Sequence, residues 1–256
     1  MTRPINLGII FGLILTTAMT VLIVQTSQMR DVKQTSEEER SALHAEIRSY
    51  ILENPQIIVE AVAILRQQEE RAEANRDEQL VQDFKKDLFD DGYSYVGGNL
   101  NGDITVVEFL DYRCGYCRKA FAEIEALLNE DMNIRFIIKE YPILGEASLV
   151  TSQFAIAVKQ LHGNETYKMI HDTLIAFSGE PTPERLGEIA GIFGLEIHPI
   201  LEHMMSGEVL KEINKNRILG EKMQITGTPT FVIKNKLLRG YISLETMQAI
   251  IASQRD

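Results

Sequence analysis

The chain opens with a predominantly apolar run, from residue 5 to residue 24, that contains no charged side chain. About 20 apolar residues are what a helix needs to cross a bilayer. No Ala-x-Ala cleavage site follows the run, which favours an uncleaved anchor over a signal peptide. We therefore expect a membrane anchor or signal segment over residues 1–24 and a polar stalk over residues 25–40.

Apolar residues recur at helical spacing in the next part of the chain, over residues 41–92. Asn54-Pro55 interrupts this pattern and predicts a break between two helices. The apolar stripe of these helices consists of Leu43, Ile47, Ile51, Ile58, Val62 and Leu65. Residues 67–79 are almost wholly polar, so the second half of the second helix has no core face of its own. The stripe either packs on the rest of the chain or binds another copy, which makes residues 41–89 a candidate oligomerisation region.

Strand patterns begin in the second part of the chain. Residues 104–110 are rich in β-branched and aromatic side chains and predict a buried strand. Residues 117–128 have the apolar spacing of a helix, and residues 134–138 predict a second strand. This order is a βαβ unit, in which reactive groups belong to the loop at the carboxyl end of the first strand.

The pattern then becomes helical over residues 146–223, with several glycine and proline breaks. Residues 230–233 and 237–242 predict a hairpin, and residues 244–251 predict a closing helix. Strands thus resume after a helical insertion. We expect residues 93–256 to form one α/β domain that carries this insertion.

Composition and charge exclude several classes of function. The net charge is −11, with 37 acidic and 26 basic residues, and it repels the phosphates of nucleic acids. A structural zinc site needs about four ligands, and the chain has only two cysteines. The five histidines show no paired ligand spacing. We therefore expect neither a nucleic acid partner nor a metal site.

The two cysteines are the strongest chemical signal in the chain. Cys114 and Cys117 enclose Gly115-Tyr116 at the start of a predicted helix, whose free N–H groups favour a thiolate. Cys114 is therefore the candidate nucleophile that forms a mixed disulfide with a substrate, and Cys117 is the candidate resolving thiol. This chemistry requires no cofactor beyond a redox-active disulfide between Cys114 and Cys117.

Glu108 stands out because it lies inside the apolar run of residues 104–110, where an unpaired carboxylate is costly to bury. The functional interpretation is proton transfer to or from Cys117, with a pKa raised by desolvation and with Lys139 as a charge partner. The alternative is an exposed position at a sheet edge.

Thr228-Pro229 is the third candidate site. A proline that opens a strand after Gly-Thr is a candidate for a cis peptide bond, which would expose the backbone of Thr228 to an extended substrate. The alternative is an ordinary trans proline at the edge of a strand.

These residues together resemble the DsbA family of thioredoxin-fold proteins. The resemblance is carried by Glu108, by the run from Phe109 to Cys117 and by Gly227-Thr228-Pro229-Thr230. In that family a helical domain is inserted between the βαβ unit and the cis-proline, and residues 146–223 occupy this place. The run from Tyr141 to Gly145 further resembles the ScsC-type disulfide isomerases and related surface antigens.

The resemblance implies a thioredoxin fold in which Glu108 is the buried acid beneath the two cysteines. It also implies that the substrate contacts Thr228, Pro229, Gly115 and Tyr116. Strong oxidases of the family carry Pro-His between the cysteines, and Gly115-Tyr116 departs from that pattern, so isomerase and oxidase both stay open. ScsC-type isomerases oligomerise through amino-terminal helices, which correspond in place to residues 41–89.

The implied function is thiol:disulfide exchange on exported proteins, with a membrane redox partner that recycles the cysteines. The implied location is the periplasm, anchored to the inner membrane through residues 5–24 or secreted if this segment is cleaved. Two other hypotheses are a non-catalytic chaperone or metal-handling module on the same fold, and a thiol sensor that faces the cytosol.

Overall fold

The computed structural model describes residues 37–255 and divides the chain into one unit up to Gln68 and another from Glu69. The anchor expected over residues 1–24, and the part of the polar stalk before residue 37, lie outside the described residues. Among the helices of residues 37–255, none combines the length and the apolar character needed to span a bilayer.

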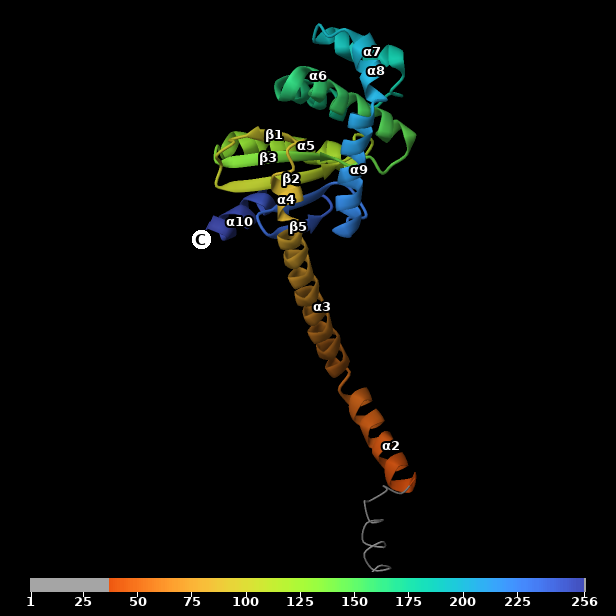
Figure 1. The fold of residues 1–256 in the computed structure, drawn as a ribbon. Helices are drawn as coiled ribbons and strands as arrows, with labels where there is room; N and C mark the ends of the chain where they lie inside the picture. Colours follow the sequence, from red (N-terminus) through yellow and green to blue (C-terminus); the bar gives the residue numbers. More distant parts are fainter. Residues whose placement is uncertain (1–36, 256) are drawn as a thin grey trace, which may run out of the picture. The chain divides into compact units, whose positions relative to one another are not determined.

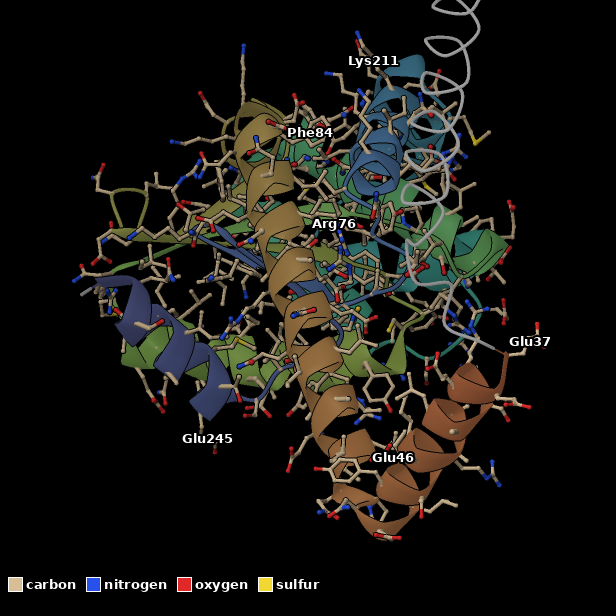
Figure 2. The ribbon with its side chains drawn as sticks, turned by 90° about the horizontal axis from the view of Figure 1, so that it is seen from below. Glu37, Glu46, Arg76, Phe84, Lys211 and Glu245 are labelled. Atoms are coloured by element: carbon tan, nitrogen blue, oxygen red, sulfur yellow. The ribbon has the colours of Figure 1, made fainter. Side chains whose placement is uncertain are left out.

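The first unit contains α2 (Glu37–Glu53) and the first part of α3 (Gln56–Asp83). α2 begins before the predicted boundary at residue 41, and glutamates in its first turn favour this start because the helix N-terminus is electropositive. The predicted break at Asn54-Pro55 is confirmed. No residue of α2 is buried, and its side chains, Glu46 among them, stand out around the helix (Figure 2).

The second unit is built on a five-stranded sheet in the order β1-β3-β2-β4-β5. The strands are β1 (Tyr95–Gly98), β2 (Ile104–Leu110), β3 (Ile134–Glu140), β4 (Thr230–Ile233) and β5 (Lys236–Arg239). β2 and β3 are parallel and joined through α5 (Gly115–Glu130), which confirms the predicted βαβ unit. β4 and β5 form the predicted hairpin, although β5 ends at Arg239 and not at residue 242.

The helical insertion lies where the sequence predicts it. Its helices are α6 (Glu146–Ala176), α7 (Pro183–Ile192), α8 (Ile197–Met204) and α9 (Gly207–Lys222). α6 to α8 gather at one end of the sheet, and α9 runs back past it (Figure 1). Gly163 interrupts α6 with a φ of 85°, a left-handed conformation that favours glycine. α10 (Leu244–Arg255) closes the domain.

Each face of the sheet has its own buried cluster, because successive residues of a strand point to opposite sides. Val106, Leu110 and Ile138 face α5, α6 and α10. Val107 and Phe109 face the opposite cluster, which includes Leu88 of α4 (Lys85–Phe89) and Met223. Since both faces are covered, β2 is a nearly continuous apolar run and not an alternating one.

Two features of this unit differ from the sequence analysis. β1 pairs antiparallel with β3 although it contains Gly97 and Gly98, which are unfavourable in strands. The polar second half of α3 also has a docking face, so that expectation was wrong. Arg239 binds both carboxylate oxygens of Asp77 at 2.5 and 2.9 Å, and Val81 is fully buried in the core.

Candidate functional site

The two cysteines lie at the start of α5 with unequal access to solvent. Cys114 is the N-cap residue of α5 and Cys117 lies in its first turn, and both are free thiols. Cys114 is 8% exposed and Cys117 is 1% exposed. Gly115 and Tyr116, between them, are exposed. An incoming substrate therefore meets Cys114 first.

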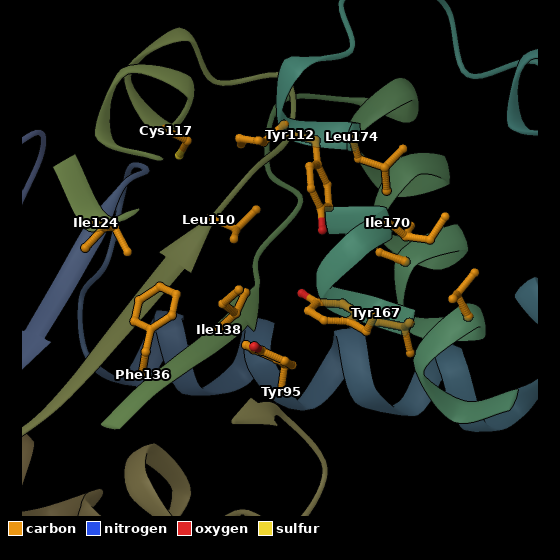
Figure 3. Packing of buried hydrophobic residues seen from close by; sticks show 14 of the residues in the cluster. Tyr95, Leu110, Tyr112, Cys117, Ile124, Phe136, Ile138, Tyr167, Ile170 and Leu174 are labelled. Atoms are coloured by element: carbon orange, nitrogen blue, oxygen red, sulfur yellow. The ribbon is translucent and has the colours of Figure 1, made fainter. Parts of the chain in front are cut away.

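The surroundings of Cys117 oppose its ionisation. Burial raises the pKa of its thiol, and the negative charge of Glu108 raises it further. Cys117 belongs to the same buried cluster as Leu110 and Ile124 (Figure 3). The thiol of Cys117 is therefore protonated in the resting reduced protein.

We expect iodoacetamide at neutral pH to modify Cys114 before Cys117 in the reduced protein, because Cys114 is the more exposed of the two and lies at the N-terminus of α5. Peptide mass spectrometry after short labelling times measures the order. Cys117→Ser is the control and should be labelled at Cys114 as fast as the natural chain. Earlier labelling of Cys117 would reverse the two roles.

Glu108 is buried, at 4% exposure, inside β2. Burial raises the pKa of its carboxyl to about 8, and the nearby charge of Glu140 contributes to the increase. The alternative of an exposed edge position is thereby excluded. Glu108 thus carries a proton at neutral pH and can release or accept one near the pH at which thiols react.

The expected pairing of Glu108 with Lys139 was wrong. Glu108 is paired with Ile138 in the parallel register of β2 and β3, so Lys139 points to the opposite face of the sheet. There its ammonium group binds Asp91 and donates to the carbonyl of Asp87 at 2.6 Å. Glu108 therefore has a like charge, Glu140, as its neighbour and no cationic partner among the causes of its raised pKa.

The pH dependence of stability follows from the raised pKa of Glu108. Between about pH 4.5 and pH 8 the folded protein holds a proton that the unfolded chain releases, so this residue contributes less stability as pH rises. We expect Glu108→Gln to increase the free energy of unfolding at pH 8 by about 2 kcal/mol or more, and by much less at pH 5.

Urea unfolding of the reduced protein at the two pH values measures this difference. The matched control is Glu202→Gln, an exposed carboxyl on α8, which should change neither value. An equal effect of Glu108→Gln at both pH values would show that Glu108 has an ordinary pKa.

Thr228-Pro229 forms a cis peptide bond, as the sequence suggests. The thiol of Cys114 donates to the carbonyl oxygen of Thr228 at 3.0 Å. The amide of Gly240 donates to the carbonyl of Pro229 at 2.9 Å, which fixes this loop against the hairpin. The structure thus brings Cys114 and Thr228 together, although 114 residues separate them in the chain.

Asp111 is a site residue that the sequence analysis missed. It is buried directly after β2, and its carboxylate accepts the amides of Arg113 at 2.8 Å, Ile143 at 2.8 Å and Leu144 at 3.0 Å. These bonds join the loop before the cysteines to the loop after β3. An acid immediately after a buried strand was the signal that could have identified it.

Two arginines beside the cysteines also have a role that the sequence did not reveal. Arg113 donates to the carbonyl of Gly179 at 2.8 Å, and Arg118 donates to the carbonyl of Ile175 at 3.1 Å. They attach the cysteine loop to the end of α6 and the segment after it. Among residues 37–255, no group of three or more His, Cys, Asp and Glu side chains is placed to hold a metal ion.

Two family models match the chain. A model described as Thioredoxin matches residues 90–253, and one described as Copper resistance protein ScsC N-terminal domain matches residues 39–72. Together they cover most of the chain beyond the region expected to be an anchor and stalk.

Several solved structures of thioredoxin-like proteins are also similar to this chain. A thioredoxin-like oxidoreductase from Silicibacter pomeroyi is 35% identical, with a TM-score of 0.62 over 66% of this chain and 96% of that one. The thiol-disulfide exchange protein alpha-DsbA2 from Wolbachia pipientis is 28% identical, with a TM-score of 0.67 over 72% and 98%. A linker-deleted variant of Proteus mirabilis ScsC shares the fold at 21% identity, with a TM-score of 0.63 over 88% and 99%.

Curated relatives include longer proteins. The Na⁺/H⁺ antiporter NhaA 1 of Salinispora arenicola is 26% identical over 160 residues, which are 62% of this chain and 24% of the antiporter. This chain therefore spans about a quarter of the length of that relative.

Proposed function

This chain belongs to the thioredoxin family, as a DsbA-like member with an ScsC amino-terminal region, and we propose that it catalyses thiol:disulfide exchange on exported proteins. The predicted DsbA-family identity of the ScsC type, and with it the thiol:disulfide oxidoreductase class, is confirmed by these matches. The observation that carries the proposal is the position of the Cys114 thiol. It lies at the N-terminus of α5, and its sulfur is 3.0 Å from the carbonyl oxygen of Thr228.

The proposed reaction uses the two cysteines in turn. The Cys114 thiolate attacks one sulfur of a substrate disulfide, forms a mixed disulfide and releases the other substrate sulfur as a thiolate. In molecules in which Glu108 has released its own proton, Cys117 then loses its proton to the Glu108 carboxylate and attacks the sulfur of Cys114, which releases the second substrate sulfur. The products are a reduced substrate and a Cys114–Cys117 disulfide, and the reverse sequence oxidises a substrate.

Substrate binding is assigned to the residues around Cys114. Gly115 and Tyr116 are exposed beside it, so they can contact a polypeptide that approaches the sulfur. The backbone of Thr228 is available to pair with an extended segment once a mixed disulfide replaces the thiol's hydrogen bond, and Pro229 shapes this loop.

Within this class we propose isomerisation as the main activity and oxidation as the second candidate. Gly115-Tyr116 offers no imidazole to stabilise the Cys114 thiolate, which disfavours a strongly oxidising couple. The apolar stripe of α2 and α3 is open to solvent, with Ile47 46% exposed and Ile58 51% exposed. A row of exposed apolar side chains along a helix is typical of an interface. We propose that a second copy of this chain covers it.

We propose that the protein works in the periplasm, held at the inner membrane by residues 5–24, where a membrane redox partner recycles its cysteines. A non-catalytic metal-handling module is the alternative from another functional class. It is favoured by one observation, the description of the match at residues 39–72 as part of a copper resistance protein.

Two assays separate these candidates. An isomerase should reactivate ribonuclease that carries scrambled disulfides, and a general oxidoreductase should at least accelerate the reduction of insulin by a thiol. We expect both activities, and Cys114→Ser should abolish both. Copper binding without either activity would favour the metal-handling module.

A further inference from the structure

A second buried acid, Glu140, lies at the end of β3 and has no part in the reaction described above. Its side chain is 2% exposed and accepts three hydroxyl hydrogen bonds. Tyr112 and Tyr167 donate to Oε1 at 2.8 and 2.6 Å, and Ser152 donates to Oε2 at 2.8 Å. The hydroxyl groups of both tyrosines project into the space between β3 and α6 (Figure 3).

Glu140 and Glu108 share one face of the sheet. Glu108 is paired with Ile138 and Leu110 is paired with Glu140, so the two acids are diagonal neighbours on adjacent strands. Such positions are about 7–8 Å apart in a sheet. At this separation the charge of one acid raises the proton affinity of the other by about tenfold or more.

Among the other polar groups around Glu140, the charge of Lys159 lowers the pKa of Glu140 and so opposes the effect of burial, but Lys159 is also engaged with other partners. On α6, Lys159 forms an ion pair with Glu212 of α9 and donates to the carbonyl of Tyr93. Also on α6, Tyr167 and His171 carry no charge at neutral pH, since burial raises the pKa of the tyrosine and lowers that of the histidine. From α9, Asn216 binds the backbone carbonyl of Glu140 and not its side chain.

We propose, resting on the exchange reaction above, that Glu140 is a positioning residue whose charge sets how strongly Glu108 holds the proton of Cys117. An ionised Glu140 makes Glu108 a stronger proton acceptor, and a neutral Glu140 makes it a weaker one. Burial raises the pKa of Glu140 to about 7 against the opposing effect of its three hydroxyl donors, so the switch falls in the physiological range.

A hydrogen-bonded chain connects Glu140 to His171. The single hydroxyl proton of Tyr112 has two acceptors within reach, Oε1 of Glu140 at 2.8 Å and Nδ1 of His171 at 3.1 Å. When Glu140 is ionised, Tyr112 donates to it and His171 must carry its proton on Nδ1. When Glu140 is neutral, it can donate to Tyr112, which donates to Nδ1, and His171 then carries its proton on Nε2.

Each proton that moves in this switch is accounted for, and Glu140 gains the equivalent of one proton taken up from outside. One proton enters at Nε2 of His171, the Nδ1 proton passes to the oxygen of Tyr112, and the former hydroxyl proton of Tyr112 passes to Glu140. Burial and Lys168 lower the pKa of His171 to about 3, so the imidazole stays neutral and changes only its tautomer. The tautomer of His171 therefore reports the charge of Glu140.

The first test follows the decay of the mixed disulfide between Cys114 and glutathione in the full-length protein. Reduced protein is mixed with oxidised glutathione, quenched with acid and analysed by mass spectrometry over a range of pH. We expect Glu140→Gln to move the midpoint of the rate profile about one pH unit lower, because Glu108 loses its charged neighbour. Glu108→Gln should abolish this pH-dependent transition in the rate profile. The profile of the double variant should match that of Glu108→Gln alone.

A Glu140→Gln profile that superimposes on that of the natural chain, while Glu108→Gln changes it, overturns this inference and leaves the proposed function intact. If Glu108→Gln is also without effect, the proton acceptor in the proposed reaction is wrong and the inference falls with it.

The second test needs no variant at Glu140 and therefore does not depend on whether such a variant folds. Nitrogen-15 NMR of the natural chain distinguishes the two neutral tautomers of His171. We expect the population to shift from Nε2–H to Nδ1–H as pH rises from about 5 to about 9, with the midpoint at the pKa of Glu140. Tyr112→Phe should abolish the shift. A single tautomer over the whole range in the natural chain contradicts the proposal.

Discussion

Cys117→Ser is expected to convert the protein into one that retains its substrates as mixed disulfides on Cys114. The Cys114 sulfur at the start of α5 still attacks, but no second thiol lies in the first turn to release the product. Turnover should fall by about four orders of magnitude or more, as for other enzymes that lose a member of their reacting group. Cys114→Ser should lose activity to the same degree.

The two variants differ in what they trap. Periplasmic extracts run on non-reducing gels should show adducts with Cys117→Ser that disappear on reduction. Cys114→Ser is the control and should show none, because its remaining sulfur is buried. Adducts of equal amount with both variants would show that Cys117 also meets substrates directly.

Two charged substitutions in the apolar stripe, Ile47→Glu with Ile58→Glu, are expected to convert an oligomer into a monomer of 29.0 kDa. Each isoleucine withdrawn from water contributes about 1.5–3 kcal/mol, so losing two from each copy weakens self-association by about a thousandfold or more. Ribonuclease reactivation should fall more than insulin reduction, since several sites around one substrate allow repeated attack.

Sedimentation of the full-length protein in detergent at micromolar concentration measures the change. The matched control, Glu46→Lys with Glu60→Lys, places new charges on exposed positions of the same helices and should leave the oligomer intact. Point substitutions are preferable to deleting residues 41–89, because Val81 and Leu88 belong to the core of the catalytic unit. If the natural chain is already a monomer, the isomerase proposal loses its structural support.

The parts of the fold that the sequence predicts best are those with a strong local period. The run of β2 is predicted at its observed ends, Ile104 and Leu110, because a strand buried on both faces is apolar at nearly every position. The helical insertion begins and ends close to residues 146 and 223 because glycine and proline positions mark its boundaries. The candidate site follows from short motifs around Cys114 and Pro229.

The remaining features depend on pairings between distant segments, which a local pattern does not encode. Lys139 follows Ile138 directly, but the register of β2 and β3 places it on the face away from Glu108. The same register brings Glu140 onto the face of Glu108, where its hydroxyl donors come from Tyr112 and from α6. The apolar period and the composition of the sequence alone could not show whether Lys139 or Glu140 shares a face of the sheet with Glu108.

The docking of α3 and the strand β1 were missed for related reasons. Asp77 is polar and carries no apolar signal, yet its carboxylate binds Arg239 from the far end of the chain. Gly97 and Gly98 disfavour a strand by themselves, and their pairing with β3 overrides this local preference.

The equilibrium of the full-length protein with mixtures of reduced and oxidised glutathione tests the central claim most directly. Acid quenching and mass spectrometry give the fraction of protein in which Cys114 and Cys117 are joined. We expect a single reversible two-electron transition between the dithiol and this disulfide, with the glutathione adduct only a minor species. A protein that stays reduced throughout, or that accumulates glutathione on Cys114 without closing the disulfide, would contradict thiol:disulfide exchange by this pair.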